Sequence, residues 1–309
     1  MSLAVNLEPQ LEPKSKDRDT KSNDKFSNAF KQYIFILVHL SCFLALWTGV
    51  SWVAALTCLA LYVLRMFAIT AGYHRLFSHR SYDTSRWFQF VMAWLGASSA
   101  QKGPLWWAGH HRHHHKHSDT EEDVHSPITE TIWWSHVGWV MSTQFVHSRP
   151  ELVKDLSRYP EIRLVDHYHL VPPLVLAIGC YLFGVLLERT APGLGTNGMQ
   201  MLVWGFCIST VLLYHGTFLV NSAAHLIGRQ RFHTGDQSRN SFWVAILTLG
   251  EGWHNNHHRY PGSEKQGFYW WEVDLSHYAL TVLSWFGIVW NLRTPPERIY
   301  QEALERKAA

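Results

Sequence analysis

The feature that most constrains the fold of this chain is an apolar run near its N-terminus. Between Tyr33 and Leu64 there is no Asp, Glu, Lys or Arg, and Gly49-Val50-Ser51 breaks the run near its middle. A helix needs about 20 apolar residues to cross a bilayer, so the run is too long for one span and fits two. We therefore expect membrane helices near 33–49 and 51–72, joined by a tight turn. Arg65, inside the second helix, is expected to snorkel to the interface or to pair with an acidic group.

A second apolar pair follows the polar middle of the chain. Leu170–Leu187 and Met199–Val220 flank a loop rich in Gly and Pro at Ala191–Gly198. Each segment is near the length of a span, which predicts helices at about 170–188 and 199–221. The expected fold class is an all-α membrane protein with four transmembrane helices in two hairpins. A buried hairpin in a soluble protein is the alternative for the first pair.

The positive charges of the chain predict its orientation in the membrane. The two short loops between paired helices carry almost no Lys or Arg, only Arg189, whereas the tail, the block 74–169 and the C-terminal block carry the rest. By the positive-inside rule, these polar blocks form a helical cap on the cytoplasmic side. We expect a multi-pass protein of a bacterial inner membrane rather than of the endoplasmic reticulum. The net charge of +3 is too small to argue for nucleic-acid binding.

The chain divides into a membrane domain and two tails. Residues 1–30 are polar and charge-rich, with Pro9 and Pro13, and are expected to be a disordered tail. The first apolar run begins near Tyr33 without a cleavage site, so no signal peptide is expected. The membrane domain is expected to cover 31–295, and 296–309 is expected to be a C-terminal tail.

Three histidine clusters lie outside the apolar runs. The densest is the run His110–His117, and the others are His74 with His79, and His254 with His257 and His258. Neutral imidazole is the commonest protein ligand for transition metals, and imidazoles packed together repel one another when they are protonated. The fold must therefore bring the three clusters together, which predicts a metal site. A histidine-rich surface patch that scavenges metal is the alternative.

The spacing of the histidines predicts which rings share a helix face. His111, His114 and His115 stand at i, i+3 and i+4, as do His254, His257 and His258, so each trio projects from one face. Adjacent rings at i+3 and i+4 straddle the axis of the first and can serve two neighbouring metals. The register His110-x-x-His113-His114 fits equally well by spacing alone. His74 and His79 diverge by about 140° on an α-helix, which suits ligands of two different ions.

The ligand set is almost entirely imidazole. The four cysteines, Cys42, Cys58, Cys180 and Cys207, all lie in apolar runs, which argues against zinc fingers and iron–sulfur clusters. Two irons beside a membrane activate oxygen, whereas two zinc ions imply hydrolysis, and spacing does not distinguish them. The 16 tryptophans and the apolar surroundings favour a lipid chain and an oxidation. We expect the acidic residues beside the clusters to orient the rings: Asp119, Asp123 and Glu251.

These residues carry a family resemblance. The segment Gly72–Arg80 resembles the first histidine box of the membrane Δ9 fatty acyl desaturases of the stearoyl-CoA type. His111–His115, followed by Asp119, Asp123 and His125, resembles the second box, and Glu251–His258 resembles the third. Asn221–His225 resembles the additional ligand segment of that family. One departure is Val124, because Pro is usual before the His at position 125.

The resemblance implies a di-iron centre that inserts a cis double bond into a saturated acyl chain with O2 and two electrons. It also implies that Arg112, directly after His111, fixes the register, so that His110, His113, His117 and His125 are not ligands. Asn221 is implied to act through a water. The implied metal ligands are His74, His79, His111, His114, His115, Asn221, His225, His254, His257 and His258, and the implied substrate contacts are Tyr62, Met66, Gln101, Trp107 and Thr217.

The resemblance also implies partners. The substrate is a fatty acyl-CoA or an acyl-lipid held near membrane lipid. The chain carries no His-Pro-Gly-Gly haem motif of a fused cytochrome b5 domain. The electrons are therefore expected from a separate ferredoxin, rubredoxin, or cytochrome b5 with its reductase.

Two other functions remain open at this point. A histidine-box alkane or lipid hydroxylase would use the same metal centre, although the Gly72–Leu76 box speaks against it. A metal transporter or sensor would place ligands inside the spans near the bilayer midplane. Here the clusters lie outside the spans, and the histidines inside them, His39 and His215, are expected to be isolated.

Overall fold

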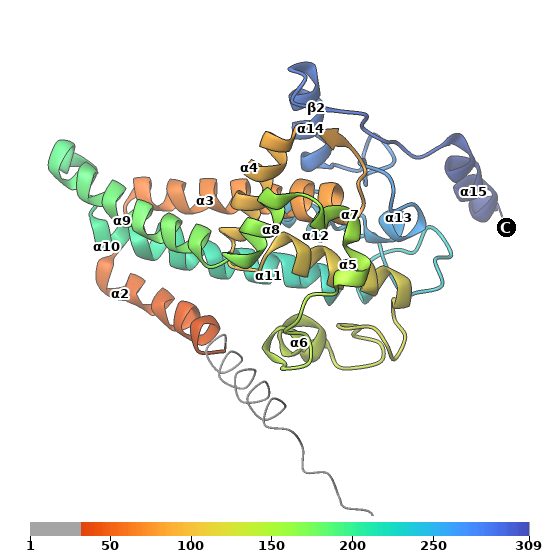
Figure 1. Ribbon diagram of the computed structural model, residues 1–309, viewed down its shortest axis with the longest axis horizontal. Helices are drawn as coiled ribbons and strands as arrows, with labels where there is room; N and C mark the ends of the chain where they lie inside the picture. Colours follow the sequence, from red (N-terminus) through yellow and green to blue (C-terminus); the bar gives the residue numbers. More distant parts are fainter. Residues whose placement is uncertain (1–31, 309) are drawn as a thin grey trace, which may run out of the picture.

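The computed structural model describes residues 32–308 and is mostly helical (Figure 1). The tail predicted for 1–30 lies outside the described residues. Three helices in the described part are long and apolar enough to cross a membrane: Trp52–Ser78, Val171–Thr190 and Gly198–His225. The span predicted near 33–49 corresponds to a shorter apolar helix, Gln32–Thr48, which ends in η1 (Cys42–Leu44) and α2 (Ala45–Thr48).

The sequence explains where one long helix begins, and two of the long helices change their winding along their length. Helix α3 (Trp52–Phe67) begins after Ser51, whose Oγ accepts a hydrogen bond from the Ala54 amide at 3.1 Å. It continues as a wider, π-type turn sequence, η2 (Ala68–Ser78). The last long helix is likewise composite, because α10 (Gly198–Met201), π-type η6 (Leu202–Ile208) and α11 (Ser209–Asn221) follow one another and end in η7 (Ala223–His225).

These helices pack side by side. Helix α3 contacts η6 and α11, and α9 (Val171–Thr190) contacts α10 and η6; the same arrangement is visible in Figure 1. Large apolar side chains face outward, among them Leu174 and Leu182 on α9, each more than half exposed. A surface of this kind is unfavourable in water and fits a lipid environment. Together with their lengths, it supports a membrane protein.

Arg65 does not behave as expected. The side chain is 1% exposed, so it does not snorkel to the interface. It donates to Ser98 O at 3.2 Å, Thr210 Oγ1 at 2.8 Å and Ser209 Oγ at 2.6 Å, which are all uncharged acceptors. The expectation of an ion pair is therefore also wrong, because hydroxyl and carbonyl oxygens surround the guanidinium instead.

The polar blocks fold into short helices at one end of the long ones. Helix α4 (Arg86–Ala97) packs against η2 and α8, and α5 (Pro104–His117) also packs against η2 and α8. A small strand pair departs from the all-α expectation, because β1 (Asp83–Thr84) pairs antiparallel with β2 (Val289–Trp290). The remaining elements are η3 (Trp134–Gly138), α6 (Trp139–Met141), η4 (Pro150–Leu152), α7 (Lys154–Ser157), α8 (Pro160–His167), η5 (Pro192–Leu194), α12 (Phe242–Leu247), α13 (His254–Arg259) and α14 (Leu275–Trp285).

The segment expected to be a C-terminal tail contains a packed helix, α15 (Glu297–Ala308). Ile299 is buried against Phe232 and Phe268. Glu302 accepts from Arg259, directly after the last histidine of the third cluster, at 2.8 Å. Thus α15 is attached to the helix that carries that cluster.

Candidate metal centre

The first histidine pair lies on the π-type segment η2 and at its end. The amide of His79 donates to His74 O at 3.2 Å, a bond from residue i+5 to residue i. A π-type turn brings residues five apart onto one face, whereas an α-helix would separate them. Both rings therefore point the same way, with centroids 4.9 Å apart. The expectation that they diverge toward two ions is wrong, because it assumed α-helical geometry.

The second cluster lies on α5, whose start is fixed by a neighbouring helix. Asp166 Oδ1, from α8, accepts from the amides of Leu105 at 2.8 Å and Trp106 at 3.1 Å. These are free helix N-terminal donors that a carboxylate satisfies. Farther along α5, Arg112 binds Asp155 and the carbonyl oxygens of Phe77 and Ser78. The helix is thereby tied to the end of η2, next to the first histidine pair.

The third cluster lies on the short helix α13. Between its histidines, Asn255 Oδ1 accepts from the amides of Arg231 and Phe232, each at 2.7 Å. Asn256 donates to Glu272 Oε2 at 2.9 Å. The two asparagines hold one face of α13 against the surrounding loops, so that the histidine face is turned toward α5.

Nine histidines converge into two adjacent groups. In each group, ring nitrogens lie within 4.8 Å of one another. Histidines that are neighbours in the sequence belong to different groups. His115 and His257 belong to the first group, whereas His114 and His258 belong to the second. The first group is His74, His79, His111, His115 and His257, and the second is His114, His225, His254 and His258.

The nitrogen spacing fits a shared metal ion. Nε2 atoms lie 2.9 Å apart in the pair His74–His257, 2.8 Å apart in His79–His111 and 2.9 Å apart in His115–His257. Ligands about 2.1 Å from a metal and at right angles to each other are about 3.0 Å apart, whereas tetrahedral ligands are about 3.4 Å apart. Five donors at right-angle spacing therefore suit a five- or six-coordinate ion better than a tetrahedral structural zinc.

Carboxylates fix which nitrogen of several rings points inward. Nδ1 of His114 donates to Asp123 at 2.9 Å, Nδ1 of His225 to Asp119 at 2.9 Å, and Nδ1 of His74 to Glu251. A carboxylate only accepts, so these rings keep the Nε2 lone pair for a metal. The expectation that Asp119, Asp123 and Glu251 orient the rings is confirmed.

The second group also contains buried nitrogens that have no hydrogen-bond partner among the described residues. They are Nε2 of His114 and Nε2 of His258. A buried polar atom without a partner destabilises the fold, and a cation bound at the lone pairs removes that cost. The donor set and its orientation thus fit two metal ions.

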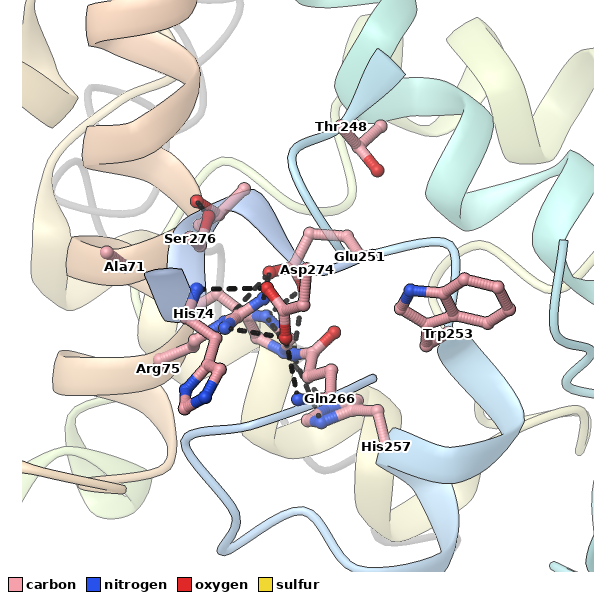
Figure 2. A network of polar contacts seen from close by, with 12 residues as sticks. Ala71, His74, Arg75, Thr248, Glu251, Trp253, His257, Gln266, Asp274 and Ser276 are labelled. Atoms are coloured by element: carbon pink, nitrogen blue, oxygen red, sulfur yellow. Dashed lines mark hydrogen bonds and ion pairs between the residues drawn. The ribbon is translucent and has the colours of Figure 1, made fainter. Parts of the chain in front are cut away.

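Behind the first group, a buried ion network supports Glu251, as Figure 2 shows. Arg75 donates to Glu251 Oε1 at 3.1 Å and to Asp274 Oδ1 at 3.0 Å. The side chain of Gln266 donates to Glu251 Oε2 at 3.1 Å, and the backbone amide of Gln266 donates to Asp274 Oδ2. Burial raises the pKa of Glu251, but His74 and Arg75 lower it further, so this carboxylate stays ionised. The charge of Arg75 therefore stabilises the acceptor that orients His74.

Six imidazoles of the centre have a pKa below the usual value. Burial, with a contribution from neighbouring imidazoles, holds the pKa of several rings well below its usual value. Burial likewise lowers the pKa of His258 to about 4, although Asp236 opposes the shift. His114 is the exception, because Asp123 outweighs burial and raises its pKa. The rings with pKa well below the usual value are His79, His111, His115, His254 and His257.

The other histidines of the second cluster lie outside the two groups. His110 Nε2 binds His147 O at 3.0 Å, His113 Nε2 binds Glu122 O at 2.9 Å, and His117 lies 3.2 Å from Glu122 Oε2. His125 packs its ring on His114 at 4.4 Å. Between the two registers left open by spacing, the structure brings His111 and not His110 to the centre.

His215 is not isolated, contrary to expectation. Its Nδ1 lies 3.0 Å from His136 Nε2, and its ring is 5.5 Å from the His39 ring. No local spacing predicts this contact, because His136 and His215 are 79 residues apart in the sequence.

An apolar cavity reaches the histidines. Its walls include His74, His111, His114 and His254 together with the side chain of Asn221 at the end of α11. The rest of the lining is dominated by apolar and aromatic groups, among them Phe35, Ile69, Trp106, Trp139, Met141, Phe145, Leu170, Tyr214 and Phe218. Such a cavity suits a long hydrocarbon chain.

Four of the five expected substrate contacts line this cavity: Met66, Gln101, Trp107 and Thr217. Gln101 Nε2 donates to Thr217 Oγ1 at 3.0 Å, and Trp107 stacks on His111 with centroids 5.0 Å apart. Tyr62 lies behind Met66 and donates to Leu247 O at 2.6 Å.

Two functional residues were missed by the sequence analysis. Asp236 Oδ2 accepts from Nδ1 of His258 at 2.6 Å, and Gln266 lies 3.3 Å from Nδ1 of His74. Neither lies in a histidine cluster, and no local spacing connects them to one. Only the fold of the loop before α12 and of the loop after α13 reveals these contacts.

The sequence matches known proteins along most of its length. The profile of the fatty acid desaturase family matches residues 50–283. An sn-1 stearoyl-lipid 9-desaturase of Anabaena variabilis is 37% identical, over 95% of this chain and 98% of that protein. An acyl-CoA 5-desaturase of Anemone leveillei is 35% identical, over 84% of this chain and 78% of that protein.

A third relative is longer. A chloroplastic palmitoyl-monogalactosyldiacylglycerol delta-7 desaturase of Arabidopsis thaliana is 35% identical over 80% of this chain. The match spans 64% of that protein, slightly less than two thirds of its length. The histidine groups, the apolar cavity and these matches agree, and the chain belongs to the fatty acid desaturase family.

Proposed function

We propose that this protein is a membrane di-iron desaturase that introduces a cis double bond, at Δ9, into a saturated fatty acyl chain with O2 and two electrons. One observation carries the proposal: two groups of buried imidazoles form part of the wall of an apolar cavity. A saturated chain has no polar handle near its middle, so a closed apolar cavity beside the metal ligands is what such a substrate requires.

The proposed cofactor is a pair of iron ions. His74, His79, His111, His115 and His257 would hold one ion; His114, His225, His254 and His258 would hold the other, with Asn221 acting through a water. When bound, the irons supply the oxygen activation that removes two hydrogen atoms from neighbouring methylenes. The right-angle spacing of five nitrogens supports iron over a tetrahedral zinc.

The residues of the chain position the substrate and keep water away. Met66, 0% exposed, lines the cavity and packs with Leu213 and Leu249, and we propose that it caps the acyl chain with Tyr62 behind it. Gln101 and Thr217 satisfy each other by a hydrogen bond, so that the cavity wall presents fewer free polar groups to the chain.

We further propose an acyl-lipid as the substrate rather than an acyl-CoA. The Anabaena relative is an sn-1 stearoyl-lipid 9-desaturase, and the match covers 98% of that relative, which supports this choice. Electrons would come from a separate ferredoxin, rubredoxin or cytochrome b5. Stearoyl-CoA and stearoyl-lipid vesicles offered to the purified protein, with each donor in turn, identify both partners.

The proposed topology has four spans in two hairpins within 31–295, under a cytoplasmic cap, in a bacterial inner membrane. The apolar helix Gln32–Thr48 would supply the span that the length criterion does not include. The near absence of Lys and Arg from the loops at 49–51 and 191–198 supports the orientation.

To test this function, the protein is expressed in cells that lack Δ9 unsaturated lipids, and the fatty esters of these cells are analysed by gas chromatography with mass spectrometry. We expect a Δ9 cis monoene with the wild-type chain and none with His111→Ala, which removes a proposed ligand. His110→Ala is the matched control, because the residue is adjacent on α5 but binds His147 O instead, and it should retain most of the product. No new monoene from the wild-type chain, or equal loss in both variants at equal expression, contradicts the proposal.

A further inference from the structure

The connection between α4 and α5, Ser98–Gly103, is held in a strained conformation. Ala100 has φ 57° and Lys102 has φ 70°, in the left-handed region that residues with a side chain rarely adopt. Ala100, Gln101 and Lys102 all line the apolar cavity. A strained backbone persists only where surrounding contacts enforce it, and strain of this kind gathers at functional sites.

Two buried side chains of the long helices bind the backbone of this loop. Arg65 of α3 donates to Ser98 O at 3.2 Å, and the hydroxyl of Tyr214 on α11 donates to Ala100 O at 3.0 Å. Arg65 also binds Ser209 and Thr210 at the start of α11, so the guanidinium joins the loop to both helices. Tyr73 adds a longer bond, 3.3 Å, to Lys102 O.

The loop also forms part of the cavity wall, so its position affects the shape of the cavity. Gln101 donates to Thr217, which lies three residues after Tyr214 on α11. One helix therefore binds both the backbone of the loop and the side chain that the loop presents to the cavity. The loop leads directly into α5, which carries Trp107 and His111. A shift of the loop would move the cavity wall relative to the histidine groups.

We propose that Arg65 and Tyr214 are positioning residues that set which pair of acyl carbons lies opposite the two histidine groups. The proposal rests on the proposed desaturase function. Because a saturated chain offers no polar group near the reacting carbons, the shape of the cavity wall alone determines how far the chain advances. Without the hydrogen bonds from Arg65 and Tyr214, the strained loop relaxes toward negative φ, and the acyl chain binds in more than one position.

The decisive variant is Tyr214→Phe, which removes one hydroxyl and leaves the ring in place. Tyr82→Phe is the matched control, because Tyr82 is also buried and also donates to a backbone carbonyl, Ala71 O at 2.8 Å, but does not contact the loop. Arg65→Gln is a second, stronger variant; Tyr214→Phe keeps the test decisive if Arg65→Gln does not fold.

Two readouts separate positioning from a merely structural role. The first is the ratio of double-bond positions in the product, measured by mass spectrometry of derivatised fatty esters. We expect Tyr214→Phe to raise the minor positional isomers about fivefold and Tyr82→Phe to keep the wild-type ratio. The second is amide hydrogen exchange of a peptide covering the loop in metal-free protein, which should be about tenfold faster in Tyr214→Phe only.

The outcomes distinguish the two proposals. If the wild-type protein makes no double bond, the proposed function is wrong. Amide hydrogen exchange still measures whether Tyr214 holds the loop in place. If the wild-type chain is active and Tyr214→Phe keeps the wild-type ratio of isomers, the positioning proposal is overturned, whatever happens to the total yield. Unchanged exchange of the loop in Tyr214→Phe overturns it as well.

Discussion

At the scale of single residues, carboxylates determine how the histidines face the centre. Asp123 follows His114 by nine residues and binds its Nδ1, so proximity in sequence already indicated this partner. Asp236, which binds His258, lies 22 residues away on the other side of α12, and no spacing rule predicts it. Sequence identifies the imidazoles by their number and spacing, whereas their orienting groups depend on how the loops close around them.

The proposed cap at Met66 leads to a prediction about chain length. Met66→Ala should shift the preference toward longer acyl chains, because each additional buried methylene contributes up to about 0.8 kcal/mol. Gly216→Ala should shift it toward shorter chains, because a Cβ there would lie 2.8 Å from Met66 Cε and 2.9 Å from the Tyr62 hydroxyl, pushing the cap inward. Competition between acyl substrates of graded length measures both shifts.

The two variants control for each other, because they change the same contact in opposite directions. An unchanged preference in both variants, or a shift of both in the same direction, would place the cap elsewhere.

At the scale of elements, the prediction for His74 and His79 was wrong because η2 is not α-helical. Spacing correctly predicts that the histidines of α5 and those of α13 project toward one site, because both segments are α-helical, although it leaves two registers open on α5. The first pair could not be predicted in the same way. Residues 68–78 form a π-type segment, and the amide of His79, directly after it, donates to the carbonyl oxygen of His74. No residue in the sequence predicts this change of helix type.

The histidine-bearing elements predict how stability depends on pH. Burial holds the pKa of five imidazoles well below its usual value, so the folded metal-free protein keeps them neutral. The unfolded chain takes up protons on these groups near pH 6.5, so unfolding binds protons below that pH and acid favours it. The raised pKa of His114 acts in the opposite direction, but it is one group against six when His258 is counted with the five.

We therefore expect the Tm of metal-free protein in detergent to fall by several degrees between pH 7.5 and pH 5.5. His115→Gln, which lacks one of the five groups, should reduce the slope by up to about 1.4 kcal/mol per pH unit. A Tm that stays constant or rises as the pH falls would show that these rings are not buried in the neutral form.

At the scale of the whole molecule, the apolar runs and histidine clusters predict the architecture better than its details. Charge-free segments and the length of a span identify the long helices, and the need for a shared site predicts that separate clusters converge. Arg65 shows where this reasoning stops. A charge in an apolar helix predicts an ion pair or snorkelling, yet its hydroxyl and carbonyl partners come from two other parts of the chain.

The number of metal ions per chain tests the central claim most directly. The protein is reconstituted anaerobically with a ferrous salt, freed of excess metal and analysed by mass spectrometry for iron and zinc against protein concentration. The two imidazole groups predict two irons per chain, and desaturation that requires them. One ion per chain, or zinc in their place with undiminished activity, would contradict the account.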